Sequence, residues 1–128
     1  MTICVARAMT LVAWNLLCFL AAASADQQVP EVSQVVNEIV AACAIGPTNA
    51  LKEPLSSELK AFLQQSIKTK TAKSADLTAL FEQFPTDTEE ALVVLRDERA
   101  RKAFFAIYFN CIGHQVGLKL KSFGIDPE

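Results

Sequence analysis

The chain has 128 residues, of which 12 are Lys or Arg and 14 are Asp or Glu, so its formal net charge is −2. This mild acidity argues against a nucleic-acid-binding protein, because such domains carry an excess of basic residues. The length suits one main domain, and the 52% of hydrophobic residues suffice for a packed core.

The beginning of the chain has the pattern of an export signal. Arg7 precedes an apolar run over residues 9–22, and Ala23-Ser24-Ala25 then supplies the small residues that a signal peptidase requires. An uncleaved membrane anchor is the disfavoured alternative, because a spanning helix needs about 20 apolar residues and the run contains Asn15.

We therefore predict a cleaved signal peptide over residues 1–25 and a single helical domain over residues 26–128. The protein is expected to be exported, to a bacterial periplasm or as a secreted protein, with no membrane span after cleavage. Removal of Arg7 leaves eleven basic and fourteen acidic residues, a net charge of −3.

Cysteine usage predicts one disulfide bond. Cys4 and Cys18 leave with the signal peptide, so the mature domain keeps only Cys43 and Cys111. In an oxidising compartment such a pair favours a bridge over two free buried thiols. The bridge would close a loop of roughly 70 residues, worth about 4 kcal/mol on the chain-entropy account.

The first predicted helix starts at Pro30, a residue suited to a first helical position. Apolar residues then recur at spacings typical of one helix face: Val32, Val35, Val36, Ile39, Val40 and Cys43. Gly46-Pro47 is expected to end the helix. Because Cys43 shares the apolar face, its side chain is predicted to point inward.

A loop through Thr48, Asn49 and Pro54 is predicted to lead to a second helix capped by Ser56 or Ser57. The apolar face of that helix contains Leu59, Phe62, Leu63 and Ile67. The polar residues 68–73 are interpreted as a connection in preference to a lysine patch for acidic lipid or sugar.

A third helix is predicted from a cap at Ser74 to Pro85, with an apolar face made of Leu77, Leu80, Phe81 and Phe84. Thr86-Asp87-Thr88-Glu89 has the capping-box pattern and predicts the start of a fourth helix. The charged residues 96–102 leave two possibilities open, a continuous helix or a bend after which Asp97 caps a new one.

Residues 103–116 form the most distinctive segment. One apolar face contains Ala103, Phe104, Ile107, Tyr108, Cys111 and Ile112, and a second contains Phe105, Phe109 and Val116. A helix that is apolar on most of its circumference must be surrounded by others. We therefore predict an all-α fold, a small bundle of four to five helices around a central apolar helix at about residues 98–116, clamped by the disulfide Cys43–Cys111.

The glycines of this region allow two interpretations. Gly113 and Gly117 either end the central helix, which we favour, or permit close contact between helices. The tail from Leu118 is then expected to form a short last helix, ended by Gly124 and Pro127.

The sequence supplies no constellation for catalysis. His114 is the only histidine, and neither a nucleophile elbow nor a suitable carboxylate pair is present. Cys111, His114 and Cys43 together would give three zinc ligands, but this metal site is a weak alternative because the second short ligand spacing is missing. A redox role is disfavoured because the two cysteines lie 68 positions apart. We predict no enzyme, no metal and no cofactor.

Our primary hypothesis is an exported helical binding or interaction protein that presents a surface or groove to a protein partner in the envelope or extracellular space. The alternative is a carrier of a small apolar ligand in a cavity of the bundle, with Phe105, Tyr108 and Phe109 as candidate ligand-binding residues. A metal or redox protein using Cys43, Cys111 and His114 is the least favoured hypothesis.

Overall fold

The computed structural model describes residues 31–128, so the predicted signal peptide, its cleavage site and Pro30 lie outside the described residues. The described part contains five helices and no strand. They are α2 (Val32–Ala42), α3 (Asn49–Thr69), α4 (Ser74–Glu82), α5 (Glu89–Val94) and α6 (Glu98–Ser122). The predicted all-α bundle is confirmed.

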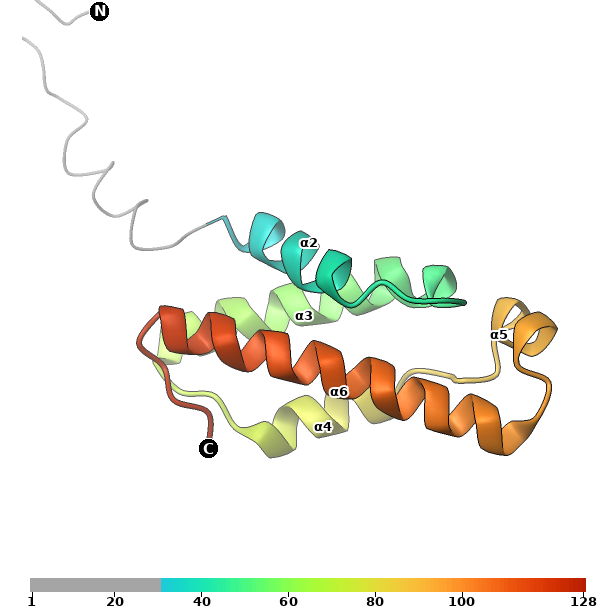
Figure 1. Cartoon of the computed structure of the whole chain (residues 1–128). Coiled ribbons are helices and arrows are strands. Elements are labelled where there is room, and N and C mark those ends of the chain that lie inside the picture. Colours follow the sequence, from blue (N-terminus) through green and yellow to red (C-terminus); the bar gives the residue numbers. More distant parts are fainter. Residues whose placement is uncertain (1–30) are drawn as a thin grey trace, which may run out of the picture. The chain divides into compact units, whose positions relative to one another are not determined.

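The longest helix, α6, runs through the middle of the bundle in Figure 1, with α2 and α3 on one side and α4 on the other. The buried side chains of α6 recur every three or four residues: Phe105, Tyr108, Ile112, Val116 and Leu120. The two faces predicted for this helix were therefore divided wrongly. Ile107 is 63% exposed, so other helices do not cover α6 all round.

Helix α2 follows the prediction. Val32, Val36 and Ile39 are buried, and Cys43 just beyond the helix is also buried, as expected from the apolar face. The turn that follows requires Gly46, whose φ of +48° is a left-handed conformation that glycine adopts freely. A Cβ atom at this position would also lie only 3.0 Å from the ring of Phe104.

Helix α3 begins at Asn49, so the predicted loop through Pro54 and the predicted caps at Ser56 or Ser57 are wrong. Pro54 lies inside the helix, where its ring costs about 3 kcal/mol by removing one backbone hydrogen bond. Leu51 and Leu55 are both buried, and each such side chain contributes about 1.5–3 kcal/mol. Burial thus offsets the proline.

The connection after α3 is shorter than expected. The helix extends to Thr69, and Lys70 ends it in the left-handed conformation with φ of 62°. Ala72 then pairs with the C-terminus, since the Glu128 amide donates to the Ala72 carbonyl at 2.9 Å. Helix α4 starts at Ser74 itself with Lys73 in the cap position, so the predicted Ser74 cap is displaced by one residue.

The charged segment between α5 and α6 contains a bend. Asp97 caps α6 because its Oδ2 accepts a hydrogen bond from the Ala100 amide at 2.8 Å. Arg101 holds the bend by donating from Nη1 to the Leu95 carbonyl at 2.9 Å. At the other end of α5, the cap is Thr88, whose hydroxyl accepts from the Ala91 amide, and the predicted capping box at Thr86 is therefore wrong.

Both glycines of α6 lie inside the helix, so the favoured interpretation of Gly113 and Gly117 as helix ends is wrong. The contact between helices requires neither glycine, because a Cβ atom at Gly113 would lie at an ordinary distance of 3.7 Å from Cε2 of Phe81 on α4, and one at Gly117 would have no neighbour within 4 Å. The expected short last helix does not exist as a separate element, because α6 continues to Ser122 and the chain turns at Gly124.

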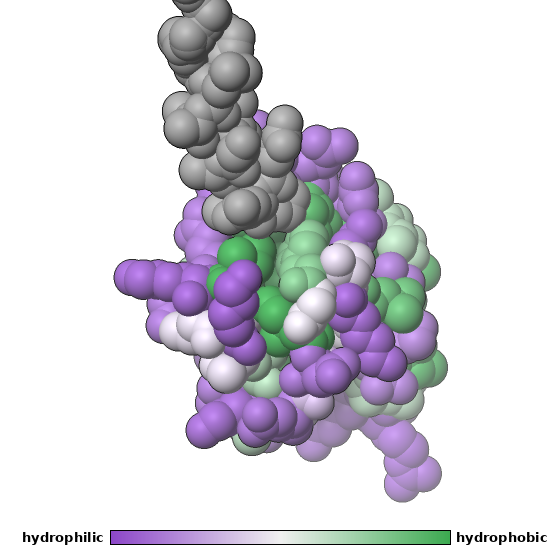
Figure 2. All heavy atoms as spheres, turned by 90° about the vertical axis from the view of Figure 1, so that its left-hand side faces the viewer, coloured by the Kyte–Doolittle hydropathy of each residue, from purple (hydrophilic) through white to green (hydrophobic). Residues whose placement is uncertain are grey.

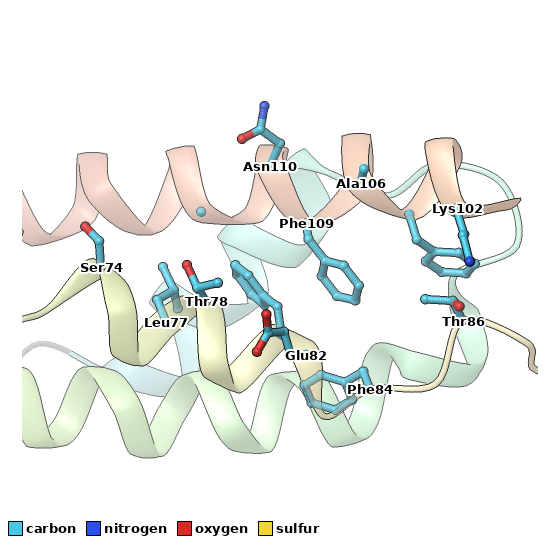
Figure 3. A pocket seen from close by; sticks show the side chains of 13 residues that line it. Ser74, Leu77, Thr78, Glu82, Phe84, Thr86, Lys102, Ala106, Phe109 and Asn110 are labelled. Carbon is cyan, nitrogen blue, oxygen red and sulfur yellow. The ribbon is translucent and has the colours of Figure 1, made fainter. Parts of the chain in front are cut away.

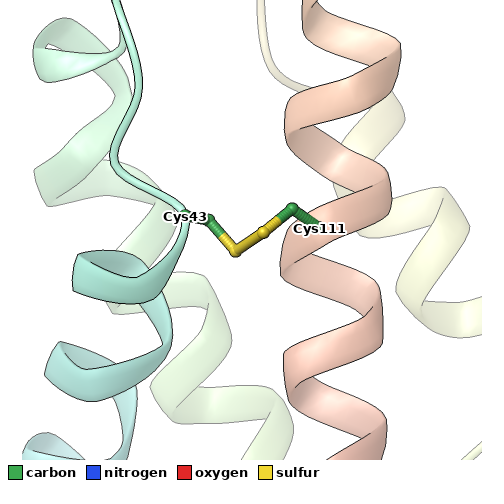
Figure 4. The surroundings of a disulfide bond; sticks show 2 residues. All are labelled: Cys43 and Cys111. Atoms are coloured by element: carbon green, nitrogen blue, oxygen red, sulfur yellow. A yellow bond between two sulfur atoms is a disulfide. The ribbon is translucent and has the colours of Figure 1, made fainter.

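The disulfide predicted from the sequence joins the end of α2 to the middle of α6 (Figure 4). The Cα atoms of Cys43 and Cys111 are 5.9 Å apart. A second link between the same helices is an ion pair on the surface, in which Lys119 Nζ lies 2.6 Å from Glu38 Oε1. The hydrogen bond from Lys119 holds the pKa of Glu38 below its usual value.

Figure 2 views the bundle from the end where α2 begins and α6 finishes, and apolar side chains gather in the middle of this end with hydrophilic ones around them. The apolar interior therefore reaches the surface here. Among residues 31–128, no helix combines the length and the hydropathy needed to cross a membrane.

We predict that replacing both cysteines, Cys43→Ala with Cys111→Ala, lowers the free energy of unfolding by about 4 kcal/mol, because the unfolded chain regains the entropy of its closed loop. The melting temperature should fall by roughly 15 °C or more, measured by circular dichroism. Lys70→Ala is the control and should leave it nearly unchanged. Equal melting temperatures for the wild type and the double variant would contradict a structural role of the bridge.

Candidate ligand-binding groove

An open groove of about 690 Å³ lies between α4 and α6 (Figure 3). Its apolar lining comes from both helices and the turn after α4: Leu77, Phe81 and Phe84 on one side and Phe105, Ala106, Phe109 and Gly113 on the other. Ligand sites in proteins have volumes of about 300–1,000 Å³ and are mostly apolar. The groove thus has the size and lining of a small-molecule site.

The groove exists because α4 covers α6 incompletely. None of the nine residues of α4 is fully buried, and Leu77 and Phe81 are only half-buried. At Gly113 of α6 the nearest side chains of α4 are Phe81 and Leu77, which lie 3.7 Å and 4.0 Å from the position that a Cβ atom would take. Away from this contact the phenyl rings border the groove and stay partly open to water.

The phenyl rings of the groove contact one another. The centroids of Phe81 and Phe109 are 5.0 Å apart in a stacked arrangement, and those of Phe84 and Phe109 are 6.4 Å apart. Phe105 lies beneath them, 6.2 Å from Phe109 between centroids and only 1% exposed. Aromatic pairs at these distances attract each other beyond their burial, so the rings form a defined apolar surface.

Polar side chains occupy the rim of the groove and comprise Ser74, Thr78, Glu82, Thr86, Lys102 and Asn110. Lys102 is also paired with Glu98 at 3.0 Å, and its hydrogen bond lowers the pKa of Glu98. Both side chains are about 70% exposed, and such a pair contributes little to stability. The weak pair leaves the ammonium group of Lys102 exposed at the end of the groove.

The three ligand-binding residues predicted from the sequence line two different cavities in the structure. Phe105 and Phe109 line the groove together, but Tyr108 lines a different cleft, between α2 and the start of α3. Leu77, Phe81 and Phe84 also line the groove, although the sequence predicted only that they form the apolar face of a helix. The signal was present in the apolar face of residues 77–84, but periodicity does not distinguish a covered face from an open one.

The metal site considered as a weak alternative would need the thiolates of Cys43 and Cys111. Cys43 and Cys111 are oxidised to a disulfide, so neither offers the thiolate that zinc or thiol exchange requires. His114 is exposed. Within residues 31–128 no three His, Cys, Asp or Glu side chains gather closely enough to hold a metal ion.

Protein-family models, curated proteins and solved structures were compared with the chain, and none of the three comparisons found a match. The fold and the groove define the class on their own: a small disulfide-linked helical bundle with an open apolar groove between α4 and α6.

Proposed function

We propose that the protein is a binding protein, not an enzyme, and that it carries a small apolar ligand in the groove between α4 and α6. The observation that supports this proposal is the cluster of Phe81, Phe84 and Phe109, which is partly open to water at the groove. Covering apolar surface contributes about 25 cal/mol per Å². A ligand that covers these rings would gain this energy without any movement of the bundle.

The shape and charge of the groove restrict the ligand. In Figure 3 the lining residues extend along both helices from Ser74 to Lys102, which suits an elongated molecule. The one acidic and the one basic lining residue, Glu82 and Lys102, have opposite charges and belong to the rim. An elongated ligand without net charge along its apolar part fits this arrangement, with any polar group at the rim.

We predict that the purified domain binds the neutral fluorescent probe N-phenyl-1-naphthylamine saturably. Ala106→Glu should weaken this binding about tenfold, because it places a charge beside the apolar lining, which a ligand would have to desolvate. The measurement is a fluorescence titration, accompanied by native mass spectrometry of freshly purified protein to identify any natural ligand.

The matched control is Ala103→Glu, which changes the same exposed residue type on the same helix outside the groove. It should bind the probe within about twofold of the wild type, a difference of less than 0.5 kcal/mol. Equal weakening by both variants, or no saturable binding by the wild type, would contradict the proposal. Binding of a peptide but not of the small probe would instead assign the groove to a protein partner.

We also infer that the protein is exported and that residues 1–25 are removed. The disulfide Cys43–Cys111 supports this inference, because such bonds persist mainly in oxidising compartments. A bacterial periplasm and the extracellular space both satisfy this condition.

The mass of the protein isolated from its native compartment should correspond to a chain that starts at Asp26. Alkylation without reductant should leave Cys43 and Cys111 unmodified, since both sulfur atoms are in the bridge. An intact N-terminus at Met1, or two alkylated cysteines, would refute export through this signal.

A second candidate function is binding of a protein partner, and a separate surface supports it. Leu92, Val93 and Val94 of α5 are 41%, 69% and 63% exposed. Three consecutive exposed apolar residues are unusual on a soluble domain and are typical of an interaction surface. The partner would be an apolar protein surface in the same compartment.

A photo-crosslinking residue at Val93 should capture one defined protein in the native compartment. The same residue at Lys60, exposed on α3, is the control and should capture none. Val94→Asp should abolish the crosslink from Val93, because a charge disfavours burial in an apolar interface. Equal capture from both positions, or no loss with Val94→Asp, would contradict a specific partner at α5.

A further inference from the structure

A second cleft, with a volume of about 390 Å³, lies between the end of α2 and the first turn of α3, with Tyr108 of α6 among its lining residues. It shares no residue with the groove between α4 and α6. Its polar lining is rich in groups that can donate hydrogen bonds: Asn37, Thr48, Asn49, Lys52 and Tyr108. None of the residues that line it is acidic.

Tyr108 is the feature of this cleft that packing does not explain. The residue is 1% exposed, and its hydroxyl has no hydrogen-bond partner in the protein. Native proteins pair nearly all buried hydroxyls, because an unpaired one destabilises the fold. The phenol is therefore a hydrogen-bond donor without an ordinary partner among the residues that line this cleft.

Thr48 lies next to this phenol and is itself 7% exposed. Burial raises the pKa of Tyr108, and the Thr48 hydroxyl offsets part of the rise, although the two groups do not form a hydrogen bond of ordinary geometry. Tyr108 therefore stays protonated at neutral pH and is available as a donor. Thr48 offers a second hydroxyl beside it.

The charge of the cleft selects the ligand. Lys52 is the one charged residue of its lining, and it is exposed at the surface of α3. The backbone amide of Ala50 at the start of α3 is already occupied, since it donates to Glu90 Oε1 at 3.0 Å. The site thus depends on side chains and not on the helix end. A cation and several donors, with no carboxylate among the lining residues, favour an anion.

We propose that this cleft binds a small monocarboxylate. The carboxylate accepts hydrogen bonds from the hydroxyls of Tyr108 and Thr48 and pairs with the ammonium group of Lys52. The short apolar part of the ligand lies against Val40 and Ala44, which also line the cleft. This ligand is distinct from the apolar molecule proposed for the groove.

The test is a titration of the ¹⁵N-labelled domain, residues 26–128 with the disulfide intact, with acetate and butyrate, followed by NMR. Both acids should shift the amide signals of Thr48, Asn49 and Lys52 saturably. The neutral analogues acetamide and butyramide should bind at least about tenfold more weakly, because they cannot pair with the ammonium group.

Tyr108→Phe and Lys52→Gln should each weaken butyrate binding about tenfold, the loss expected for one hydrogen bond to a charged group. Lys60→Gln, on the same helix outside the cleft, is the control and should bind as the wild type does. Without ligand, Tyr108→Phe should melt at the same temperature as the wild type or higher, because it removes an unpaired buried hydroxyl. If Tyr108→Phe is as stable as the wild type, its weaker binding of butyrate results from the lost contact and not from misfolding.

Three results would overturn the proposal. The first is the absence of saturable shifts with either acid at tens of millimolar, and the second is equal affinity for an acid and its amide. The third is a crystal structure grown with butyrate in which Tyr108 bonds to a single water molecule only. The groove variant Ala106→Glu should bind butyrate as the wild type does, because Ala106 does not line the cleft. A failure of the butyrate test therefore leaves the proposed function of the groove intact, and a failure of the probe test leaves the proposal for the cleft intact.

Discussion

The covalent junction between α2 and α6 is the constraint on which the rest of the bundle depends. Helix α2 has 11 residues, several of them β-branched, and a helix of this length is not stable alone in water. The apolar face of α2 is buried only by packing against α3 and α6, and the disulfide Cys43–Cys111 holds the helix in that position. The bridge joins positions 68 residues apart and so connects the first helix of the described domain to the last.

The junction makes the two sides of α6 different. Toward α2 and α3 the helix is covered by fully buried side chains such as Ile39, Leu55 and Leu59. Toward α4 it is covered only by half-buried ones, and no covalent link holds α4 in place. Elements with few buried contacts open most easily. The side of the bundle with the lowest expected local stability is therefore the side that contains the groove.

The two candidate ligand sites have different structural origins. The groove is apolar because α4 leaves the rings of Phe81 and Phe109 incompletely covered. The cleft near Tyr108 is polar because the chain turns sharply between α2 and α3, which brings Thr48 and Lys52 beside the buried phenol. We propose binding as the function of both sites.

The sequence by itself determined the helical class and the core face of α2, because both depend on a local period. The pairing of Cys43 with Cys111 followed from the cysteine count only with Cys4 and Cys18 assigned to the predicted signal peptide. The sequence did not determine where α3 begins, since the burial of Leu51 and Leu55 overrides the local effect of Pro54. Nor could the sequence show that Tyr108 and Phe109, which are neighbours on one helix, line different cavities. Which side of α6 meets α2 and which meets α4 is decided by packing between distant segments, and only the tertiary structure contains that information.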